Sequence, residues 1–340
     1  MATSVSLRSF LFVQMTPSPD GSSPRVTLNF PDIRLDYSWP ISDLPLLQNV
    51  LPIAPSSLSS DILKTLEPCL EPFAKKEVQN AAVMAFLYLF VSLYRPGTSD
   101  IRFVLRSSIP IGAGLGSSAS ISVCLSTALL IISNHILFPS GPNPDVLKII
   151  NDWAFLGEKC IHGNPSGVDN TVATFGGGVF FRKERRERKL SNGTFTPSQP
   201  AEKEIIRYVP LAFLSKHRIP PVHFLLTDTN HPRRTANLVA RVAELMTTLP
   251  GVTTHILSAI DGIAAEAKRL LESDENITER LGELISINQG LLNSVGVGHE
   301  KLDTVARITK DIGWTKLTGA GGGGSALTLL HEGISLYLCV

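Results

Sequence analysis

The chain has 340 residues, which is enough for two domains that each bury a core of their own. Hydrophobic residues make up 43% of the sequence, charged residues make up 18%, and the formal net charge is +1. This is the composition of an ordinary globular protein, and it excludes a broad basic surface for nucleic acid as well as an acidic tail. The apolar run at residues 81–93 falls short of the ~20 residues that a membrane-spanning helix needs.

The chain begins with strand-like segments. Alternating apolar residues predict a strand over residues 2–14 and further strands within 24–36, with a turn rich in proline and serine between them. Residues 1–14 are poor in acidic residues, as transit peptides are, but their apolar pattern favours a strand. Short helices interrupted by proline are expected over residues 43–51 and 59–73.

Two apolar helices with a strand between them come next. Residues 74–94 predict a helix that is apolar almost all round after its first turns and must therefore be buried. A strand over residues 100–107 leads into a glycine-rich loop, and a second apolar helix over 118–133 follows the loop. Two such helices against one sheet predict a layered core.

Residues 109–122 read Ile-Pro-Ile-Gly-Ala-Gly-Leu-Gly-Ser-Ser-Ala-Ser-Ile-Ser and predict a phosphate-binding loop. Gly112, Gly114 and Gly116 lack a Cβ atom, so the backbone can take positive φ angles and approach a bulky anion. The first turn of the next helix would offer N–H groups to phosphate, and the two serines there would offer hydroxyls. A P-loop is excluded because no lysine follows, and a dinucleotide fingerprint is excluded because Ser117 replaces its third glycine. A turn that needs glycine for geometry alone is the alternative.

An amphipathic helix is expected over residues 145–162, and a glycine, an asparagine and a proline end it. Ser166 and Asp169 fit a capping box that opens a short helix through Ala173, and an apolar strand over 179–181 comes after three glycines. The charged stretch that follows mixes Lys, Arg and Glu, so we interpret residues 184–204 as a surface loop between domains.

The second half of the chain alternates between strands and helices. A second glycine run lies between residues 316 and 325, where four consecutive glycines would let two backbones approach closely. A flexible linker is the alternative reading, but strand-like residues flank the run tightly on both sides. The expected elements are a strand at 222–228, helices at 235–249, 253–273, 278–294 and 300–312, and a strand at 326–330.

The four cysteines lie far apart, with no C-x-x-C pair and no spacing that suits a metal ion. We expect buried thiols in a reducing compartment, and therefore a cytoplasmic protein.

Three motifs together resemble the GHMP kinase superfamily and, within it, the mevalonate kinase family. Residues 109–120 resemble the second superfamily motif and residues 316–325 the third. Residues 153–170, Trp-Ala-Phe-Leu-Gly-Glu-Lys-Cys-Ile-His-Gly-Asn-Pro-Ser-Gly-Val-Asp-Asn, are similar to the family segment that carries a metal-binding glutamate and a catalytic aspartate. Residues 288–289 and 296–299 also resemble the family.

The resemblance implies a two-domain α+β fold with the active site in the cleft between the domains. Residues 1–183 would form an N-terminal domain like domain 2 of ribosomal protein S5, and residues 205–340 a ferredoxin-like α/β sandwich. The implied reaction is transfer of the γ-phosphate of ATP to the 5-hydroxyl of (R)-mevalonate, in isoprenoid and sterol synthesis. A homodimer is expected, without membrane insertion.

The resemblance also assigns roles to residues, and phosphoryl transfer to an alcohol needs such groups in any case. Asp169 would accept the hydroxyl proton, while Ser118 and Glu158 would ligate Mg²⁺. His162, Arg233 and Thr235 would contact the substrate. The nucleotide would be bound by Pro110, Gly112, Ala113, Gly114, Leu115, Gly116, Ser117, Ser118 and Ala119, with Gly319, Ala320, Gly321 and Gly322 of the third motif nearby.

Plainer roles stay open for several of these residues. Asp169 fits the capping box as well as catalysis, and the two roles are compatible. Glu158 would be a solvated carboxylate on a helix face, and His162 a helix-terminal histidine. Arg233 and Thr235 would mark an exposed helix start.

The sequence departs from the family at both ends. The first family motif carries a lysine, followed by a Gly-Glu-His turn, and nothing like it precedes Thr3. The helix and strand that close the second domain in the family are also missing after the strand at 326–330. We therefore expect an enzyme sequence shortened at both ends. The alternatives are a catalytically silent relative that binds nucleotide or a partner, and another small-molecule GHMP kinase acting on phosphomevalonate, homoserine or galactose.

Overall fold

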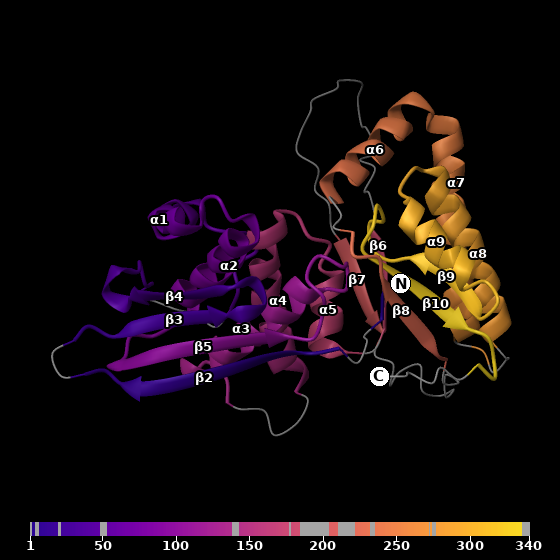
Figure 1. Cartoon of the computed structure of the whole chain (residues 1–340). Helices are drawn as coiled ribbons and strands as arrows, with labels where there is room; N and C mark the ends of the chain where they lie inside the picture. Colours follow the sequence, from indigo (N-terminus) through magenta and orange to yellow (C-terminus); the bar gives the residue numbers. More distant parts are fainter. Residues whose placement is uncertain are drawn as a thin grey trace, which may run out of the picture. The chain divides into compact units, whose positions relative to one another are not determined.

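The computed structural model consists of two compact units, formed by residues 1–109 with 116–210 and by residues 110–115 with 211–340. Both units combine helices and strands (Figure 1), which confirms the expected two-domain α+β organisation. For residues 2–3, 178–183, 204–209 and 235–236 the structure describes the backbone but not the side chains. The residues described are 2–3, 7–19, 22–47, 53–137, 143–176, 178–183, 204–209, 222–231, 235–271, 273 and 277–334.

A four-stranded sheet in the order β2-β5-β3-β4 carries the core of the first unit. β5 is parallel to β3 and antiparallel to β2, and β3 is antiparallel to β4. Alternate side chains such as Leu28 and Phe103 are buried on one face of the sheet. The strands are β2 (Ser9–Pro17), β3 (Arg25–Phe30), β4 (Leu35–Pro40) and β5 (Ser99–Ser107).

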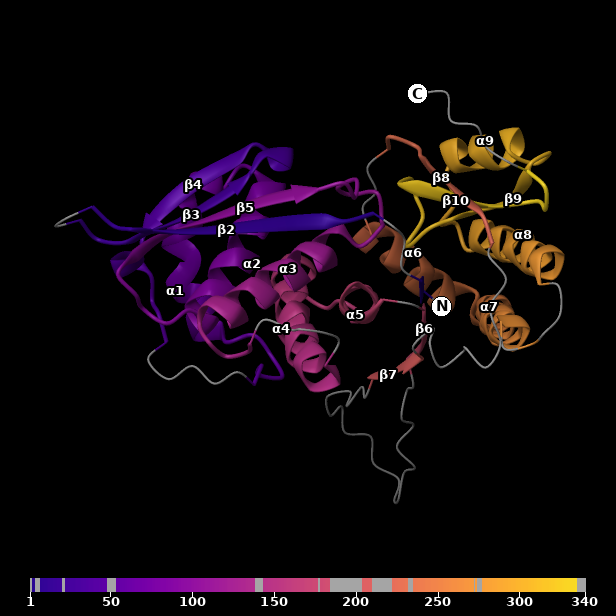
Figure 2. The same cartoon turned by 90° about the horizontal axis from the view of Figure 1, so that it is seen from below.

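Helices pack against that buried face, and Figure 2 shows them on one side of the sheet. Residues 85–93 of α2 are all buried, so the expectation of a buried apolar helix is confirmed. The helices are α1 (Ser60–Leu70), α2 (Glu77–Leu93), α3 (Ser117–Ile132), α4 (Pro144–His162) and α5 (Val168–Phe175), with the short 3₁₀ turns η1 (Pro31–Ile33), η2 (Ile41–Asp43) and η3 (Glu71–Phe73).

Some expected boundaries are wrong. The strand expected over 2–14 is two strands, because β1 (Ala2–Thr3) belongs to a separate antiparallel sheet with β6 (Gly178–Lys183) and β7 (Glu204–Val209). The further strands expected within 24–36 are confirmed as β3 and the start of β4, with η1 between them. The helix expected over 43–51 is absent from residues 44–47, and the residues beyond them lie outside the description. Residues 184–203 of the expected surface loop also lie outside it.

In the described part of the second unit, a three-stranded antiparallel sheet in the order β8-β10-β9 packs with four helices. Its core contains Val295, Val297, Leu302, Leu317 and Ala326, which are buried. The elements are β8 (Phe224–Asp228), α6 (Thr235–Thr248), α7 (Pro250–Leu271), α8 (Thr278–Ser294), α9 (Glu300–Ile308), β9 (Gly313–Leu317) and β10 (Ser325–Leu330). β9 is formed by the strand-like residues noted before the second glycine run, for which no bounds were predicted.

Two further expectations concern chemistry and membranes. Cys69, Cys124 and Cys160 are free thiols, but each is only partly buried, so the expected full burial is wrong for these three, and Cys339 lies outside the described residues. Burial raises the pKa of the Cys124 thiol to about 11. In the parts of the chain that the structure describes, none of the helices combines the length and the apolar character needed to cross a bilayer.

Candidate active site

The glycine loop has the backbone conformation that its sequence predicts. Gly112, Gly114 and Gly116 have φ angles of 78°, 78° and 73°, a region that glycine enters without steric cost. Ala113, between the first two of these glycines, is buried, with 4% of its surface exposed. Pro110 and Ile111, which precede the glycines, are exposed to solvent. The alternation of positive and negative φ angles gives the loop a defined, curved path before α3 begins.

The first turn of α3 lacks a side-chain cap, because its N-cap residue is Gly116. A helix that begins in this way leaves N–H groups for an external acceptor, and its dipole favours an anion there. The hydroxyl of Ser117 is buried and has no hydrogen-bond partner among the described residues. Such a start to a helix suits phosphate oxygens.

Four polar side chains meet at this end of α3, all within the first unit. The Oγ atom of Ser118 lies 3.1 Å from Nε2 of His162, and Ser118 also hydrogen-bonds to the carboxylate of Glu158. Glu158 and His162 are four residues apart on α4, so they share one face of that helix. Asp169 lies beside the loop, because a Cβ atom added to Gly116 would be 3.6 Å from its Cβ atom.

Close packing of α3 and α4 brings these groups together. A Cβ atom on Gly157 would lie only 2.8 Å from the Oγ atom of Ser122 on α3 and 3.3 Å from Leu89 on α2. Only glycine therefore allows α4 to approach this closely, one residue before Glu158. Our sequence interpretation missed this contact, although a glycine inside a predicted amphipathic helix is a signal for it.

Asp169 is the second residue of α5, in its first turn, and it is exposed. The expected capping box is wrong: the N-cap is Gly167 at φ 79°, which makes no side-chain cap. The Ser166 hydroxyl instead accepts from the N–H of Val168 at 3.3 Å. Asn170 anchors the helix by donating to Oδ1 of Asn151 at 2.8 Å. The positive end of α5 still favours an ionised carboxylate at this position.

Glu158 is 3% exposed, so the interpretation as a solvated helix-face carboxylate is wrong. Its pKa is raised to about 7, mainly because burial disfavours the charged form. The hydrogen bond from Ser118 lowers the pKa, and the negative charge of Asp169 raises it. A buried carboxylate next to a second carboxylate needs a compensating positive charge.

The oxygen atoms in this cluster fit a hard divalent cation. Oε1 of Glu158 is buried without a hydrogen-bond partner among the described residues, and Ser118 supplies a hydroxyl next to the same carboxylate. The described residues contain no group of three or more His, Cys, Asp or Glu side chains that could hold a metal ion. Magnesium commonly uses only one or two carboxylates, with phosphate and water oxygens completing its shell. The donor set is therefore adequate for Mg²⁺ carried by a nucleotide.

The second glycine run is ordered by specific contacts, which argues against a flexible linker. Gly319, Gly321, Gly322, Gly323 and Gly324 all have positive φ angles. The N–H of Gly322 donates to the carbonyl of Val297 at 2.8 Å, and the N–H of Gly324 donates to the carbonyl of His231 at 2.9 Å.

This run also contacts the first glycine loop, inside the second unit. The N–H of Ser325 donates to the carbonyl of Ala113 at 3.1 Å. A Cβ atom on Gly321 would collide with the carbonyl oxygen of Val297, so the run cannot carry side chains there. The two glycine motifs, more than half of the chain apart, are thus joined by a direct backbone contact.

The remaining substrate-side residues are not placed. Arg233 lies outside the described residues, and Thr235 is the first residue of α6 but its side chain is outside the description. Their roles stay predictions.

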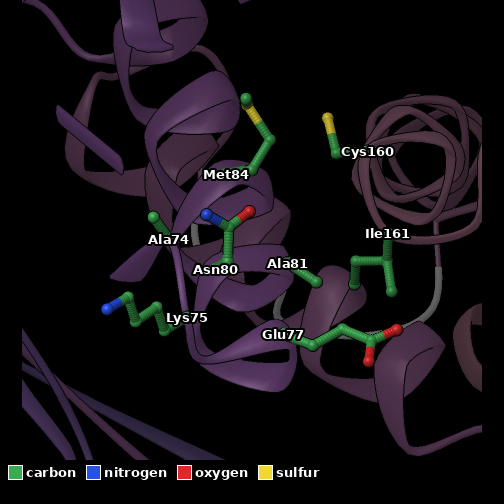
Figure 3. Close-up of a pocket in the computed structure, with 8 residues that line it drawn as sticks. All are labelled: Ala74, Lys75, Glu77, Asn80, Ala81, Met84, Cys160 and Ile161. Atoms are coloured by element: carbon green, nitrogen blue, oxygen red, sulfur yellow. The ribbon is translucent and has the colours of Figure 1, made fainter. Parts of the chain in front are cut away.

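An open cavity of about 510 Å³ also occurs in the first unit, between the start of α2 and the end of α4. Figure 3 shows Met84 on one wall and Cys160 on the other. Its α4 residues, Cys160 and Ile161, lie on a different face of the helix from Glu158 and His162. None of the expected site residues lines the cavity, so we assign it no part in the site.

Comparison with known proteins gives two family matches. Residues 80–178 match the model described as GHMP kinases N terminal domain, and residues 271–333 match GHMP kinases C terminal. Mevalonate kinase of Candida albicans is 40% identical over 356 residues, which cover 98% of this chain and 77% of that protein. Mevalonate kinase of Homo sapiens is 36% identical, with 98% and 81% covered.

Solved structures agree on the fold. The structure of L. major mevalonate kinase in complex with R-mevalonate matches with a TM-score of 0.66 and 19% identity, over 97% of this chain and 80% of that one. Methanococcus jannaschii mevalonate kinase matches with a TM-score of 0.66 and 22% identity, over 95% and 81%.

Proposed function

The chain belongs to the mevalonate kinase family of GHMP kinases, and from this we propose that it transfers the γ-phosphate of ATP to the 5-hydroxyl of (R)-mevalonate. The family consists of ATP-dependent kinases, so the proposal concerns this chain's own acceptor and its own residues. It would act in isoprenoid and sterol synthesis.

One observation carries the proposal: Ser118, Glu158, His162 and Asp169 gather at the uncapped start of α3, next to a loop of glycines with positive φ. A phosphate cradle, oxygen donors for a cation and a carboxylate base are the three parts that phosphoryl transfer to an alcohol requires. The start of α3 with Gly116, the oxygen donors Ser118 and Glu158, and the carboxylate of Asp169 all occur in the first unit.

Each part of the site has a proposed role in phosphoryl transfer. The glycine loop and the first turn of α3 bind the phosphates of ATP. The exposed carboxylate of Asp169 accepts the proton of the attacking hydroxyl, a role worth about 10²- to 10⁴-fold in rate. His162 orients the Ser118 hydroxyl through their 3.1 Å contact and takes part in binding the acceptor. Arg233 and Thr235 are proposed to contact the carboxylate end of mevalonate.

Mg²⁺ is proposed to be held by Ser118 and Glu158, where it would neutralise the charge of the phosphates. The buried Oε1 atom of Glu158, which lacks a partner among the described residues, supports this assignment.

The test is a panel of acceptor alcohols assayed by ADP release with ATP and Mg²⁺. We expect ADP formation with (R)-mevalonate and none above background with phosphomevalonate, homoserine or galactose. Turnover of another acceptor in preference to mevalonate would overturn the proposed substrate. ATP binding by a folded protein without any turnover would instead identify a silent relative.

We further propose a cytoplasmic homodimer. The dimer is proposed from the first unit, where β2 is an edge strand of the four-stranded sheet. Two phenylalanines on this strand, Phe10 and Phe12, are 47% and 62% exposed. Such an apolar edge is available for pairing with a second copy.

A further inference from the structure

The glycine run at residues 319–324 has no regular secondary structure of its own, so its shape depends on what holds its two flanks. The flank after the run is the start of β10, whose Ser325 binds the first glycine loop as described. The flank before the run is the end of β9, an edge strand of the β8-β10-β9 sheet. An edge strand leaves some N–H groups without a partner in the sheet.

One of those N–H groups is bound by a buried glutamine. The N–H of Leu317, the last residue of β9, donates to Oε1 of Gln289 on α8 at 2.8 Å. Gln289 is 8% exposed, and Leu317 is 1% exposed. This hydrogen bond therefore attaches the end of β9 to α8 in a place that water does not reach.

The glutamine is the first member of a chain of side chains. Its Nε2 atom donates to Oδ1 of Asn293 at 3.1 Å, and Nδ2 of Asn293 donates to Oδ1 of Asp303 on α9 at 3.1 Å. A backbone N–H can only donate, and a carboxylate can only accept. Both amide orientations are therefore determined by the two ends of the chain, which runs in one direction from Leu317 to Asp303.

The same hydrogen-bonded side chains also support residues 297–298, which contact the 319–324 glycine run. Gly298 packs so closely on Oδ1 of Asn293 that a Cβ atom there would collide with it. The preceding residue, Val297, accepts the N–H of Gly322. Gln289 and Asn293 thus hold both the strand that enters the glycine run and the loop that binds its middle.

We propose that Gln289 is a positioning residue for nucleotide binding: it holds the 319–324 run in the shape that places Ser325 against Ala113 of the first glycine loop. The proposal rests on the proposed function for its link to ATP, whereas the hydrogen-bond chain itself does not. Loss of the hydrogen bonds that link Leu317, Gln289, Asn293 and Asp303 should weaken ATP binding more than it lowers the stability of the fold.

The experiment compares Gln289→Leu and Gln289→Glu with Ile287→Ala, a control on α8 whose side chain is 54% exposed. Titration of the full chain with ATP, without mevalonate, should show affinity weakened about tenfold in both Gln289 variants and unchanged in the control. Amide hydrogen exchange at residues 317–325 should accelerate in the same two variants.

The direction of the hydrogen bonds from Leu317 to Asp303 allows a more specific test of the positioning role. In Gln289→Glu the new carboxylate still accepts from Leu317 but repels Oδ1 of Asn293, so Asn293 must turn its amide around. The Oδ1 atom of the turned Asn293 amide then needs a hydrogen-bond donor at position 303, which Asp303→Asn supplies. We expect Asp303→Asn alone to change ATP affinity less than twofold, and the double variant to recover most of the affinity and exchange protection lost in Gln289→Glu.

The outcomes separate the two proposals. Unchanged exchange at 317–325 in Gln289→Leu, or no recovery in the double variant, would overturn the positioning role. A native chain that binds no ATP would overturn the proposed function, while the exchange data would still test the hydrogen-bond chain. If Gln289→Leu fails to fold, Gln289→Glu and its double variant carry the test, because they keep the acceptor for Leu317.

Discussion

Glu158 combines a structural cost with a proposed function. Its carboxylate is buried beside Asp169, and its pKa is raised to about 7 from 4.5. Because the folded state holds the proton more tightly than the unfolded state, this residue's contribution to stability is complete below pH 4.5 and is lost as the pH rises through 7. Above pH 7 the charged carboxylate therefore destabilises the metal-free fold.

Glu158→Gln should therefore stabilise the metal-free protein while abolishing activity. The amide has nearly the same shape but carries no charge, so we expect the free energy of unfolding to rise by up to about 3 kcal/mol at pH 8. The gain should vanish at pH 4.5. Thermal unfolding at the two pH values measures it, and ADP release measures the activity. A variant that is less stable than the native protein at pH 8, or that remains active, would show that the carboxylate has another role.

Among the elements, the pair α3 and α4 decides where the site forms. Ser118 comes from the start of α3, and Glu158 and His162 come from the last turns of α4. The two helices meet at Gly157 and Ser122, where only the small side chain of Ser122 lies between them. Small residues at a helix contact allow the backbones to approach, and here that approach brings the carboxylate within hydrogen-bond reach of the hydroxyl.

Gly157→Ala should push these helices apart. The new methyl group would meet Ser122 at 2.8 Å, which is closer than real Cβ contacts, so we expect a loss of about 1 to 3 kcal/mol in stability and a loss of activity. Gly262→Ala on α7 is the matched control, because nothing lies within 4 Å of its added Cβ atom. The control should gain up to about 1 kcal/mol from helix propensity. Chemical denaturation of both variants measures the difference, and equal effects would argue against the packing account.

At the scale of the whole molecule, local patterns predicted much of the site. The positive φ angles at Gly112, Gly114 and Gly116 and the shared face of Glu158 and His162 follow from residue type and helical spacing. The family resemblance supplied the roles. These features depend on neighbours a few residues away, which the sequence displays directly.

Other features depend on contacts between distant segments and could not be predicted. The capping box expected at Ser166 is wrong for a local reason, because Gly167 at φ 79° is the N-cap and α5 begins at Val168. The strand-like residues before the second glycine run form β9, which is only five residues long. Its hydrogen bond to Gln289 depends on how α8 packs against that edge. Nothing in the local pattern around Gln289 specifies a partner 28 residues further along the chain.

Asp169, which lies beside Gly116 at the start of α3, is the proposed base of this ATP-dependent kinase. Asp169→Asn removes the base but keeps the shape of the side chain, and both forms can be compared by ATP titration and by mevalonate-dependent ADP release. We predict unchanged ATP affinity within about threefold and turnover reduced about 10²- to 10⁴-fold. Turnover within tenfold of the native enzyme would show that Asp169 is not the base.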